Sequence, residues 1–201
     1  LDVVAPTVFP YFAVVYAGAF YRGQREIDPV LTAIQAAARI RGRSEPPIRL
    51  HYYGAEVQHV MERARACGSE NLVECHGQVP RAQALAAIRG AGAAAVIASI
   101  RERADLAERG IITGKIFEPL GMGVPILLVA PEGSDAAAIV EGARAGRGFQ
   151  AGQGDAMGNW LAELAGDPSR GRYDPPKAYS WTVLGRRLDE ILRRAMGSRE
   201  C

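Results

Sequence analysis

Residues 12 to 18 read Phe-Ala-Val-Val-Tyr-Ala-Gly, and this short stretch decides the fold class. It is a continuous apolar run that ends at a glycine, without the apolar and polar alternation of a strand with one solvated face. A loop as far as Gly23 follows, and a segment with apolar residues at helical spacing then begins. Asp28 is predicted as the N-cap of this helix and Pro29 as its first residue. A buried strand followed by a helix is the unit of which parallel sheets are made.

The same alternation of apolar strand and amphipathic helix continues along the chain. Further strands are predicted at 48–53, 72–76, 93–100, 124–130 and 148–151. Further helices are predicted at 57–67, 81–89, 115–121, 134–145 with Ser134 as N-cap, 155–165 and 178–195. Because buried strands that alternate with helices are typical of parallel sheets, we predict an α/β fold. It is a Rossmann-like, doubly wound parallel sheet of about six strands with right-handed crossovers.

Composition excludes several classes of protein. The chain has 201 residues, of which 48% are hydrophobic and 23% charged, so it has enough apolar material for a globular core and is neither disordered nor fibrous. The formal net charge is +2, which gives no strong field to attract nucleic acid or an anionic membrane. We therefore expect no nucleic-acid partner. The longest apolar runs, such as 91–100, are about half as long as a bilayer requires, so no transmembrane segment is expected.

Cysteine and histidine usage argues against a disulfide framework and against a metal site. Cys67, Cys75 and Cys201 form neither an even set nor a Cys-x-x-Cys pair, and the histidines are too scattered for a zinc motif. A cytoplasmic location is therefore expected. The chain starts without methionine and without a basic, signal-like region, and this start suggests a fragment of a longer protein.

Glycines follow several of the predicted strands at the edge where parallel sheets bind ligands. The first loop, after Gly18, also carries Arg22 and Arg25, and cations beside a glycine turn suit a phosphate group. It is not a Walker loop, because Gly-x4-Gly is followed by Gln-Arg. The alternative is an ordinary strand-to-helix turn with solvated arginines. The other glycines that follow predicted strands are Gly54, Gly77 and Gly133.

A second candidate site lies in the stretch Thr113 to Pro125, around one of only two lysines in the chain. Lys115 and Glu118 are three residues apart, so one helical turn places them on the same face. An ammonium suits diphosphate oxygens, and a carboxylate can accept hydrogen bonds from both hydroxyls of a ribose. Gly114 leaves room for such a ligand. The alternative is a structural Lys-Glu pair that contributes only about 0.2 to 0.5 kcal/mol.

Other residues with reactive or aromatic side chains receive structural interpretations. His51 is predicted as a strand residue and His59 as a helix-face residue rather than as ligands, because no partner is evident. Cys75 is predicted as an inert core thiol. Trp160 and Trp181 fit helical periodicity and are predicted to be packing anchors.

With these loops in place, the chain resembles the carboxyl-terminal halves of GT-B-fold glycosyltransferases, the group called glycosyl transferases group 1. The Gly-Lys-x-x-Glu stretch discriminates best, and the resemblance extends over nearly the whole chain. The motifs that carry it are Tyr16-Ala-Gly-Ala-Phe-Tyr-Arg-Gly, His51-Tyr-Tyr-Gly-Ala-Glu, Val73-Glu-Cys-His-Gly-Gln-Val-Pro, Gly114-Lys-Ile-Phe-Glu-Pro-Leu-Gly-Met-Gly-Val-Pro-Ile and Tyr179-Ser-Trp-Thr-Val-Leu-Gly-Arg-Arg-Leu.

The resemblance implies that this half binds the donor, a nucleoside diphosphate sugar with UDP or GDP most expected. An amino-terminal half, absent here, would bind the acceptor, a sugar or glycolipid. No further cofactor and no metal ion are expected, because cationic side chains would stabilise the departing diphosphate. The isolated half is expected to bind the donor without turning it over.

The resemblance also assigns roles to individual residues. Arg22 and Lys115 would be the catalytic cations at the diphosphate, which Gly18 would also face. Glu118 would hold the ribose, and the base would lie against the backbone of the 77–79 loop. The full predicted binding set is Gly18, Arg22, Gly77, Gln78, Val79, Gly114, Lys115 and Glu118.

Two departures from the family pattern leave questions open. Many retaining members have a glutamate eight residues before the second one, but position 110 is a glycine and the nearest acid, Glu108, is out of register. Retention or inversion of the sugar therefore stays open. The arginine that usually follows the first glycine is replaced by Ala19, so Arg22 or Arg25 must supply its charge.

Three parts of the chain are predicted: a linker or entry segment at 1–11, the nucleotide-sugar-binding domain at 12–176, and a helix and tail at 177–201. In this family the last helix often crosses to the other half, so we expect it to expose apolar surface and to favour a homodimer. Two alternatives stay open: a sugar-nucleotide epimerase of the same architecture, and a degenerate module that keeps the sheet without the site.

Overall fold

The computed structural model describes residues 4–42, 45–102 and 104–197. Its centre is one sheet of six parallel strands in the order β3-β2-β1-β4-β5-β6, which confirms the predicted α/β, Rossmann-like fold. The strands are β1 (Phe12–Ala17), β2 (Ile48–Tyr53), β3 (Val73–Cys75), β4 (Ala93–Ile97), β5 (Ile126–Val129) and β6 (Gly146–Phe149).

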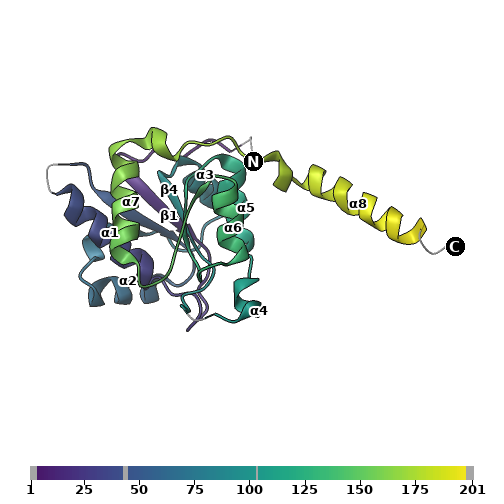
Figure 1. Ribbon diagram of the computed structural model, residues 1–201. Coiled ribbons are helices and arrows are strands. Elements are labelled where there is room, and N and C mark those ends of the chain that lie inside the picture. The colour runs from purple at the N-terminus through teal and green to yellow at the C-terminus, as the bar shows by residue number, and fades with distance from the viewer. Residues whose placement is uncertain (1–3, 43–44, 103, 198–201) are drawn as a thin grey trace.

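Helices cover both faces of this sheet. Figure 1 shows α1, α2 and α7 on one side and α3, α5 and α6 on the other. A short 3-10 turn, η2 (Gly114–Ile116), leads directly into α5. The helices are α1 (Asp28–Arg41), α2 (Val57–Ala66), α3 (Arg81–Gly90), α4 (Leu106–Arg109), α5 (Phe117–Met122), α6 (Asp135–Gly142), α7 (Gly154–Gly166) and α8 (Trp181–Gly197).

Burial on both faces explains the continuous apolar strands. Val14 packs into the cluster beneath α1, α2 and α7, whereas its neighbour Val15 packs into a separate cluster with α3. Both side chains are almost completely buried. Successive residues of a strand point to opposite faces, so a strand covered on both sides needs apolar residues at every position.

The strand order reverses at β1, and this reversal positions the ligand-binding edge. The chain passes from β1 outward to β3 on one side, then returns to β4 beside β1 and passes outward to β6. Loops that leave β1 and β4 therefore diverge to opposite sides of the sheet, which opens a crevice at the carboxyl ends of the strands. Gly18 directly follows β1 at this point.

Most predicted boundaries lie within a few residues of the observed ones, with some corrections. The N-cap assignment of Asp28 is wrong, because α1 begins at Asp28 itself with Ile27 as cap, and the Asp28 carboxylate pairs with Arg63. The Ser134 cap is confirmed, since its Oγ accepts a hydrogen bond from the Ala137 amide at 3.2 Å. The sequence did not predict α4, whose four residues are too few to show a period.

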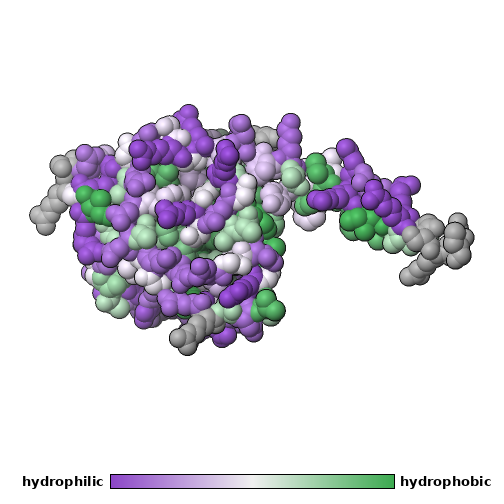
Figure 2. Space-filling model, viewed as in Figure 1, coloured by the Kyte–Doolittle hydropathy of each residue, from purple (hydrophilic) through white to green (hydrophobic). Residues whose placement is uncertain are grey.

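The carboxyl-terminal helix α8 extends away from the rest of the molecule (Figure 1). Trp181 at its start is 90% exposed, so its prediction as a packing anchor is wrong. Trp160 does pack, with its ring against Phe149 in the core. Figure 2 shows apolar residues gathered along α8, among them the exposed Leu188 and Ile191. Among the described residues, no helix combines the length and hydrophobicity needed to cross a bilayer.

Candidate functional site

A cavity of about 420 Å³ lies at the crevice beside the carboxyl ends of β1 and β2. Its walls come from the loops after both strands, from α3 and from the η2–α5 segment. Five residues of the predicted binding set line it: Gly18, Gln78, Val79, Lys115 and Glu118. Segments nearly one hundred residues apart in the sequence therefore meet in one place.

Lys115 lies directly against the turn at Gly18. Its Nζ donates hydrogen bonds to the Tyr16 hydroxyl at 3.1 Å and to the Ala19 carbonyl at 3.0 Å. A Cβ atom on Gly18 would lie only 2.5 Å from the Lys115 Cε and Nζ atoms. Gly18 also has φ +127°, which L side chains rarely adopt. The turn thus needs a glycine both for its backbone and for the approach of the lysine.

The ammonium group of Lys115 is held in an environment that disfavours its charge. Burial and then the nearby charge of Arg25 lower the pKa of Lys115 to about 8, while the Glu56 carboxylate opposes this shift. No anion accepts a hydrogen bond from Nζ in the described structure, since both of its acceptors are neutral oxygens. A dianionic ligand placed here would interact with an ammonium group that has no anionic partner, and its negative charge would raise the pKa of Lys115.

Glu118 lies in the first turn of α5 and faces the same cavity. Its Oε1 atom accepts a hydrogen bond from Nη2 of Arg81, an exposed side chain at the start of α3 that also lines the cavity. No described residue bonds its Oε2 atom. The Oε2 atom of this carboxylate can therefore still accept hydrogen bonds from a ligand in the cavity. The alternative prediction, a Lys115–Glu118 ion pair, is not formed.

The two arginines of the first loop occupy different environments. Arg22 is exposed and is not among the residues that line the cavity. Arg25 is partly buried, donates from Nε to the Ala98 carbonyl at 3.1 Å and lies with its guanidinium carbon 4.8 Å from the Tyr21 ring centroid. Its charge is the one that reaches Lys115. Neither arginine lines the cavity, and of the two that the sequence offered for a phosphate, Arg25 is the one whose charge acts on Lys115.

Of the remaining predicted residues, Gln78 and Val79 line the cavity, whereas Gly77 and Gly114 do not. Gly77 has φ +69°, and its carbonyl accepts a hydrogen bond from the Gly54 amide at 3.0 Å, which ties together the loops after β2 and β3. Gln78 and Val79 follow on the cavity side. Gly114 has no neighbouring atom within 4 Å of a built Cβ, so it leaves open space beside Lys115.

Glu56 is a residue of this region that the sequence analysis did not identify. Its Oε2 accepts hydrogen bonds from the Phe20 amide at 3.0 Å and from the Tyr52 hydroxyl at 3.5 Å. It thereby holds the first loop against the turn after β2. The sequence analysis includes this glutamate only as the end of a motif that begins at His51 and gives it no role, because its partners lie on another strand and loop.

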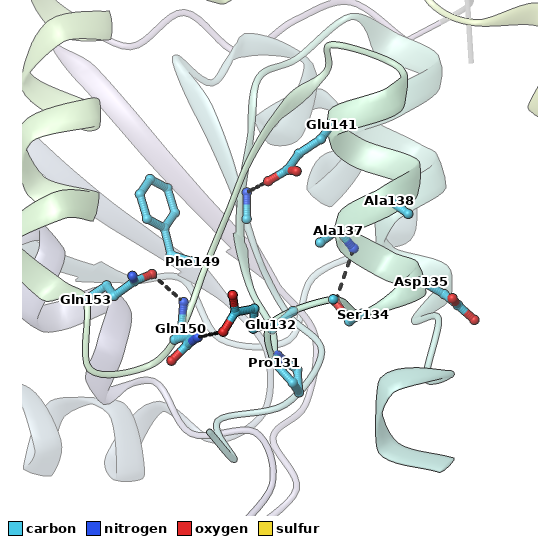
Figure 3. Close-up of a pocket in the computed structure, with 13 residues that line it drawn as sticks. Pro131, Glu132, Ser134, Asp135, Ala137, Ala138, Glu141, Phe149, Gln150 and Gln153 are labelled. Atoms are coloured by element: carbon cyan, nitrogen blue, oxygen red, sulfur yellow. Dashed lines mark hydrogen bonds between the residues drawn. The ribbon is translucent and has the colours of Figure 1, made fainter. Parts of the chain in front are cut away.

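A second cavity, of about 430 Å³, lies at the β5 and β6 end of the sheet (Figure 3). Gly133 lies here rather than with the other strand-end glycines. The charged side chains that line it are the carboxylates of Glu132, Asp135 and Glu141. Glu132 accepts a hydrogen bond from Gln150 at 3.2 Å and Glu141 one from the Gly148 amide at 3.1 Å. An acidic wall repels phosphate, so the cavity at Lys115 is the better candidate for an anionic ligand.

Two of the three histidines meet although they lie far apart in the sequence. β2 and β3 pair in parallel with His51 opposite Glu74, and His51 Nδ1 lies 2.9 Å from His76 Nε2. Burial lowers the pKa of both imidazoles. His51 is a strand residue, as predicted, and His59 lies on α2 with its Nε2 at 3.1 Å from Glu26. The strand register, which residue spacing does not reveal, creates the His51–His76 pair.

Comparisons with known proteins place the fold. No family model and no curated protein matches the sequence. The lipopolysaccharide outer core galactosyltransferase WaaB is 13% identical with a TM-score of 0.66, over 96% of this chain and 52% of WaaB. HepE from Anabaena, solved with UDP and glucose, is 17% identical with a TM-score of 0.61, over 92% of this chain and 48% of HepE. A putative UDP-N-acetylglucosamine 2-epimerase from Listeria monocytogenes is 12% identical with a TM-score of 0.57, over 94% of this chain and 46% of the epimerase.

These similarities establish the fold. Two further glycosyltransferases, WaaG and AviGT4, are among the matching structures. The chain spans about half the length of each of these five structures. It therefore has the fold of one half of the GT-B architecture, consistent with the carboxyl-terminal domain.

Proposed function

We propose that this chain is the donor-binding domain of a GT-B glycosyltransferase and that it holds a nucleoside diphosphate sugar in the cavity at Lys115. The observation that carries the proposal is the approach of the Lys115 ammonium to the Gly18 turn at the crevice of the sheet. Gly18 removes the side chain that would block a diphosphate, and Lys115 supplies a cation with neutral partners. A diphosphate is the ligand that best uses both features.

The rest of the cavity supports a nucleotide of which the diphosphate is one part. Glu118 would accept hydrogen bonds from the ribose hydroxyls with its Oε2 atom while Oε1 stays on Arg81. The backbone around Gln78 and Val79 would meet the base. Because backbone groups would contact the base, the side chains do not distinguish UDP from GDP, and the proposal includes both. The structure of HepE, which contains UDP and glucose, favours UDP.

In catalysis the cations would act on the leaving group. When the bond from the sugar to the diphosphate breaks, negative charge develops on the diphosphate oxygens. Lys115 would stabilise that charge from a fixed position, as predicted, and Arg25, whose charge acts on Lys115, is the arginine that we propose to assist it. The acceptor, a sugar or glycolipid, would be held by a separate amino-terminal domain in the cytoplasm.

The domain limits are part of the proposal. We assign residues 12–176 to the nucleotide-sugar-binding domain, 1–11 to a linker and 177–201 to the terminal helix and tail. The exposed apolar side chains of α8 are compatible with the expected homodimer. A sugar-nucleotide epimerase is the second candidate, because the Listeria protein shares the fold over 94% of this chain. The assay that separates the two is sugar transfer against epimerisation by the full-length protein.

A panel of nucleotides tests the proposed site. In thermal unfolding experiments with UDP, GDP, ADP and TDP, we expect one of them to stabilise the chain clearly. A ligand at about one hundred times its dissociation constant adds roughly 2.7 kcal/mol to the free energy of unfolding. For a chain of this length, that gain raises the melting temperature by roughly 5 to 10 °C.

The control for this panel is the corresponding nucleoside, which lacks the diphosphate. We expect uridine or guanosine to give a much smaller shift, because it cannot engage Lys115. If none of the four nucleotides raises the melting temperature at millimolar concentration, the result would contradict the proposal and favour a degenerate module that has lost its site.

Binding of the diphosphate is also expected to depend on pH. The protonated form of Lys115, whose pKa is about 8, is the form that binds an anion. Protonation is lost as pH rises through 8, so affinity falls in the same direction. If only protonated Lys115 binds, the dissociation constant rises about tenfold between pH 7 and pH 9. Titration calorimetry with UDP over this range measures the change, and it also detects proton uptake on binding.

Other groups around Lys115 do not reproduce this pH dependence. Burial raises the pKa of the Tyr16 hydroxyl, which moves it further from the range. An affinity that is constant from pH 7 to pH 9 would exclude Lys115 as the cation on the diphosphate.

A further inference from the structure

Two imidazoles and a carboxylate converge at the β2–β3 edge of the sheet, outside the cavity at Lys115. His51 Nδ1 lies 2.9 Å from His76 Nε2 and 3.8 Å from Glu74 Oε2. One ligand atom from each of the three residues lies within 4.8 Å of the others. Two ligands about 2.0 to 2.1 Å from a tetrahedral zinc ion lie about 3.3 Å apart, so changes of up to about 1.5 Å in the separations of these atoms would bring all three onto one ion.

The three side chains are held in place by their surroundings. Glu74 Oε1 accepts a hydrogen bond from Nη1 of Arg49 at 2.8 Å and one from the Tyr11 hydroxyl at 2.5 Å, so the carboxylate is fixed with Oε2 toward His51. His76 stacks on Tyr53 with ring centroids 4.3 Å apart. Ligands of metal ions are commonly oriented in this way by outer hydrogen bonds and packing.

The two imidazoles differ in exposure, and the difference suits a site with an entry path. The His51 side chain is 2% exposed, and its Nε2 atom is buried without a hydrogen-bond partner among the described residues. Its Nδ1 atom is therefore the nitrogen that can meet a ligand. His76 is exposed. An ion can thus enter from the His76 side and keep a water molecule as its fourth ligand.

We propose that His51, Glu74 and His76 bind one divalent transition-metal ion, with Zn²⁺ as the preferred occupant. Two nitrogens and one carboxylate oxygen suit zinc better than calcium or magnesium, which prefer oxygen ligands throughout. When Nδ1 of His51 binds the metal ion, the proton of the neutral imidazole lies on Nε2, which is buried and has no hydrogen-bond acceptor among the described residues. We therefore expect this site to bind Zn²⁺ more weakly than structural zinc sites do.

This site is separate from the proposed donor-binding function. Tyr53 stands between the two, since one side of it lines the cavity at Lys115 and its ring stacks on His76. Cys75, although adjacent in sequence to two of the ligands, packs with the cluster on the other face of the sheet. The site therefore does not need a thiol, and it can exist whether or not a nucleotide binds.

The test is titration calorimetry of the chain with ZnCl₂ in chelator-free buffer at pH 7. We expect one Zn²⁺ per chain, and we expect His76→Ala to weaken binding by more than about tenfold. The Co²⁺ complex of the wild type should show visible absorption of a four-coordinate site, which His76→Ala should lack. His76→Ala also loses the stacking on Tyr53, so each protein is compared with itself: Zn²⁺ should raise the melting temperature of the wild type and leave that of His76→Ala unchanged.

His59→Ala is the matched control, because this third histidine lies on α2, where it pairs with Glu26, away from the cluster. It should bind Zn²⁺ as the wild type does. Cys67→Ser controls for binding by an exposed thiol and should also leave the affinity unchanged. Absence of Zn²⁺ binding to the wild type at submillimolar concentration would overturn the proposal, as would wild-type affinity in His76→Ala. Neither result would bear on nucleotide binding.

Discussion

Lys115→Met is expected to weaken binding of the stabilising nucleoside diphosphate by about 100-fold. Methionine has a similar length but no charge, so the variant removes the cation and keeps most of the packing volume. A hydrogen bond to a charged group contributes about 1.5 to 3 kcal/mol, and a 100-fold loss corresponds to about 2.7 kcal/mol. Titration calorimetry at pH 7 measures the change in the dissociation constant.

The same substitution should affect the fold little, and this contrast makes the test specific. Burial and the charge of Arg25 hold the pKa of Lys115 below its usual value, so the charged form is disfavoured in the unliganded protein. The Tyr16 hydroxyl keeps a hydrogen bond to the Ala19 carbonyl at 3.1 Å without the lysine. We expect the free energy of unfolding to change by less than about 1 kcal/mol. The pH dependence of binding between pH 7 and 9 should disappear.

The chain offers a matched control in its only other lysine. Lys177 begins a short 3-10 turn before α8 and does not line the cavity. Lys177→Met removes the same charge from the molecule and should leave nucleotide affinity within about twofold, because distant surface charges are screened. Equal losses in the two variants would mean that net charge and not the position of Lys115 governs binding.

Glu118→Ala is the second large effect that we expect, with a loss of affinity of about 10- to 100-fold. A carboxylate that accepts hydrogen bonds from ribose hydroxyls contributes about 1.5 to 3 kcal/mol in total when charged acceptors are involved. The effect should depend on the ribose of the nucleotide. The substitution should weaken binding of a 2′-deoxynucleotide, which lacks one hydroxyl, less than it weakens binding of the ribonucleotide. Competition calorimetry with both nucleotides measures the difference.

Glu108→Ala provides the comparison for this second prediction. Glu108 lies on α4 and pairs with Arg101 at 2.8 Å, and it does not line the cavity. It is the acid nearest to the position where many retaining members have their first glutamate. We expect it to leave ribonucleotide affinity unchanged. Equal effects of Glu118→Ala and Glu108→Ala would remove the ribose assignment while leaving the diphosphate assignment at Lys115 intact.

The sequence was sufficient for the fold because the deciding signals are local. The run at 12–17 without polar alternation can be stable only with both faces covered, and it recurs at intervals filled by helices. The strand boundaries of β1 and β2 agree with the prediction at every residue. Helix ends were predicted less accurately: Ile27 and not Asp28 caps α1, because the Asp28 carboxylate pairs with Arg63 on α2.

The candidate site was predictable only in part. Gly18, Lys115 and Glu118 are unusual in type or spacing, so the sequence could indicate them. The sequence analysis assigned Glu56 no role and could not rank Arg25 above Arg22, because both questions depend on how the loops after β1 and β2 are brought together. Trp181 shows the opposite error, because helical periodicity predicts a buried face but cannot supply the surface that would bury it.

By itself, the sequence determined a doubly wound parallel sheet and a glycine turn at the carboxyl end of its first strand, because periodicity and glycine act within a few residues. Tertiary structure alone decided which charges face one another. It brought Lys115 to Gly18 across the sheet edge, turned Glu118 to Arg81, and joined His51 to His76 through the register of two strands. Such pairings depend on which segments lie close together in the folded chain, and the spacing of residues along the sequence does not show this.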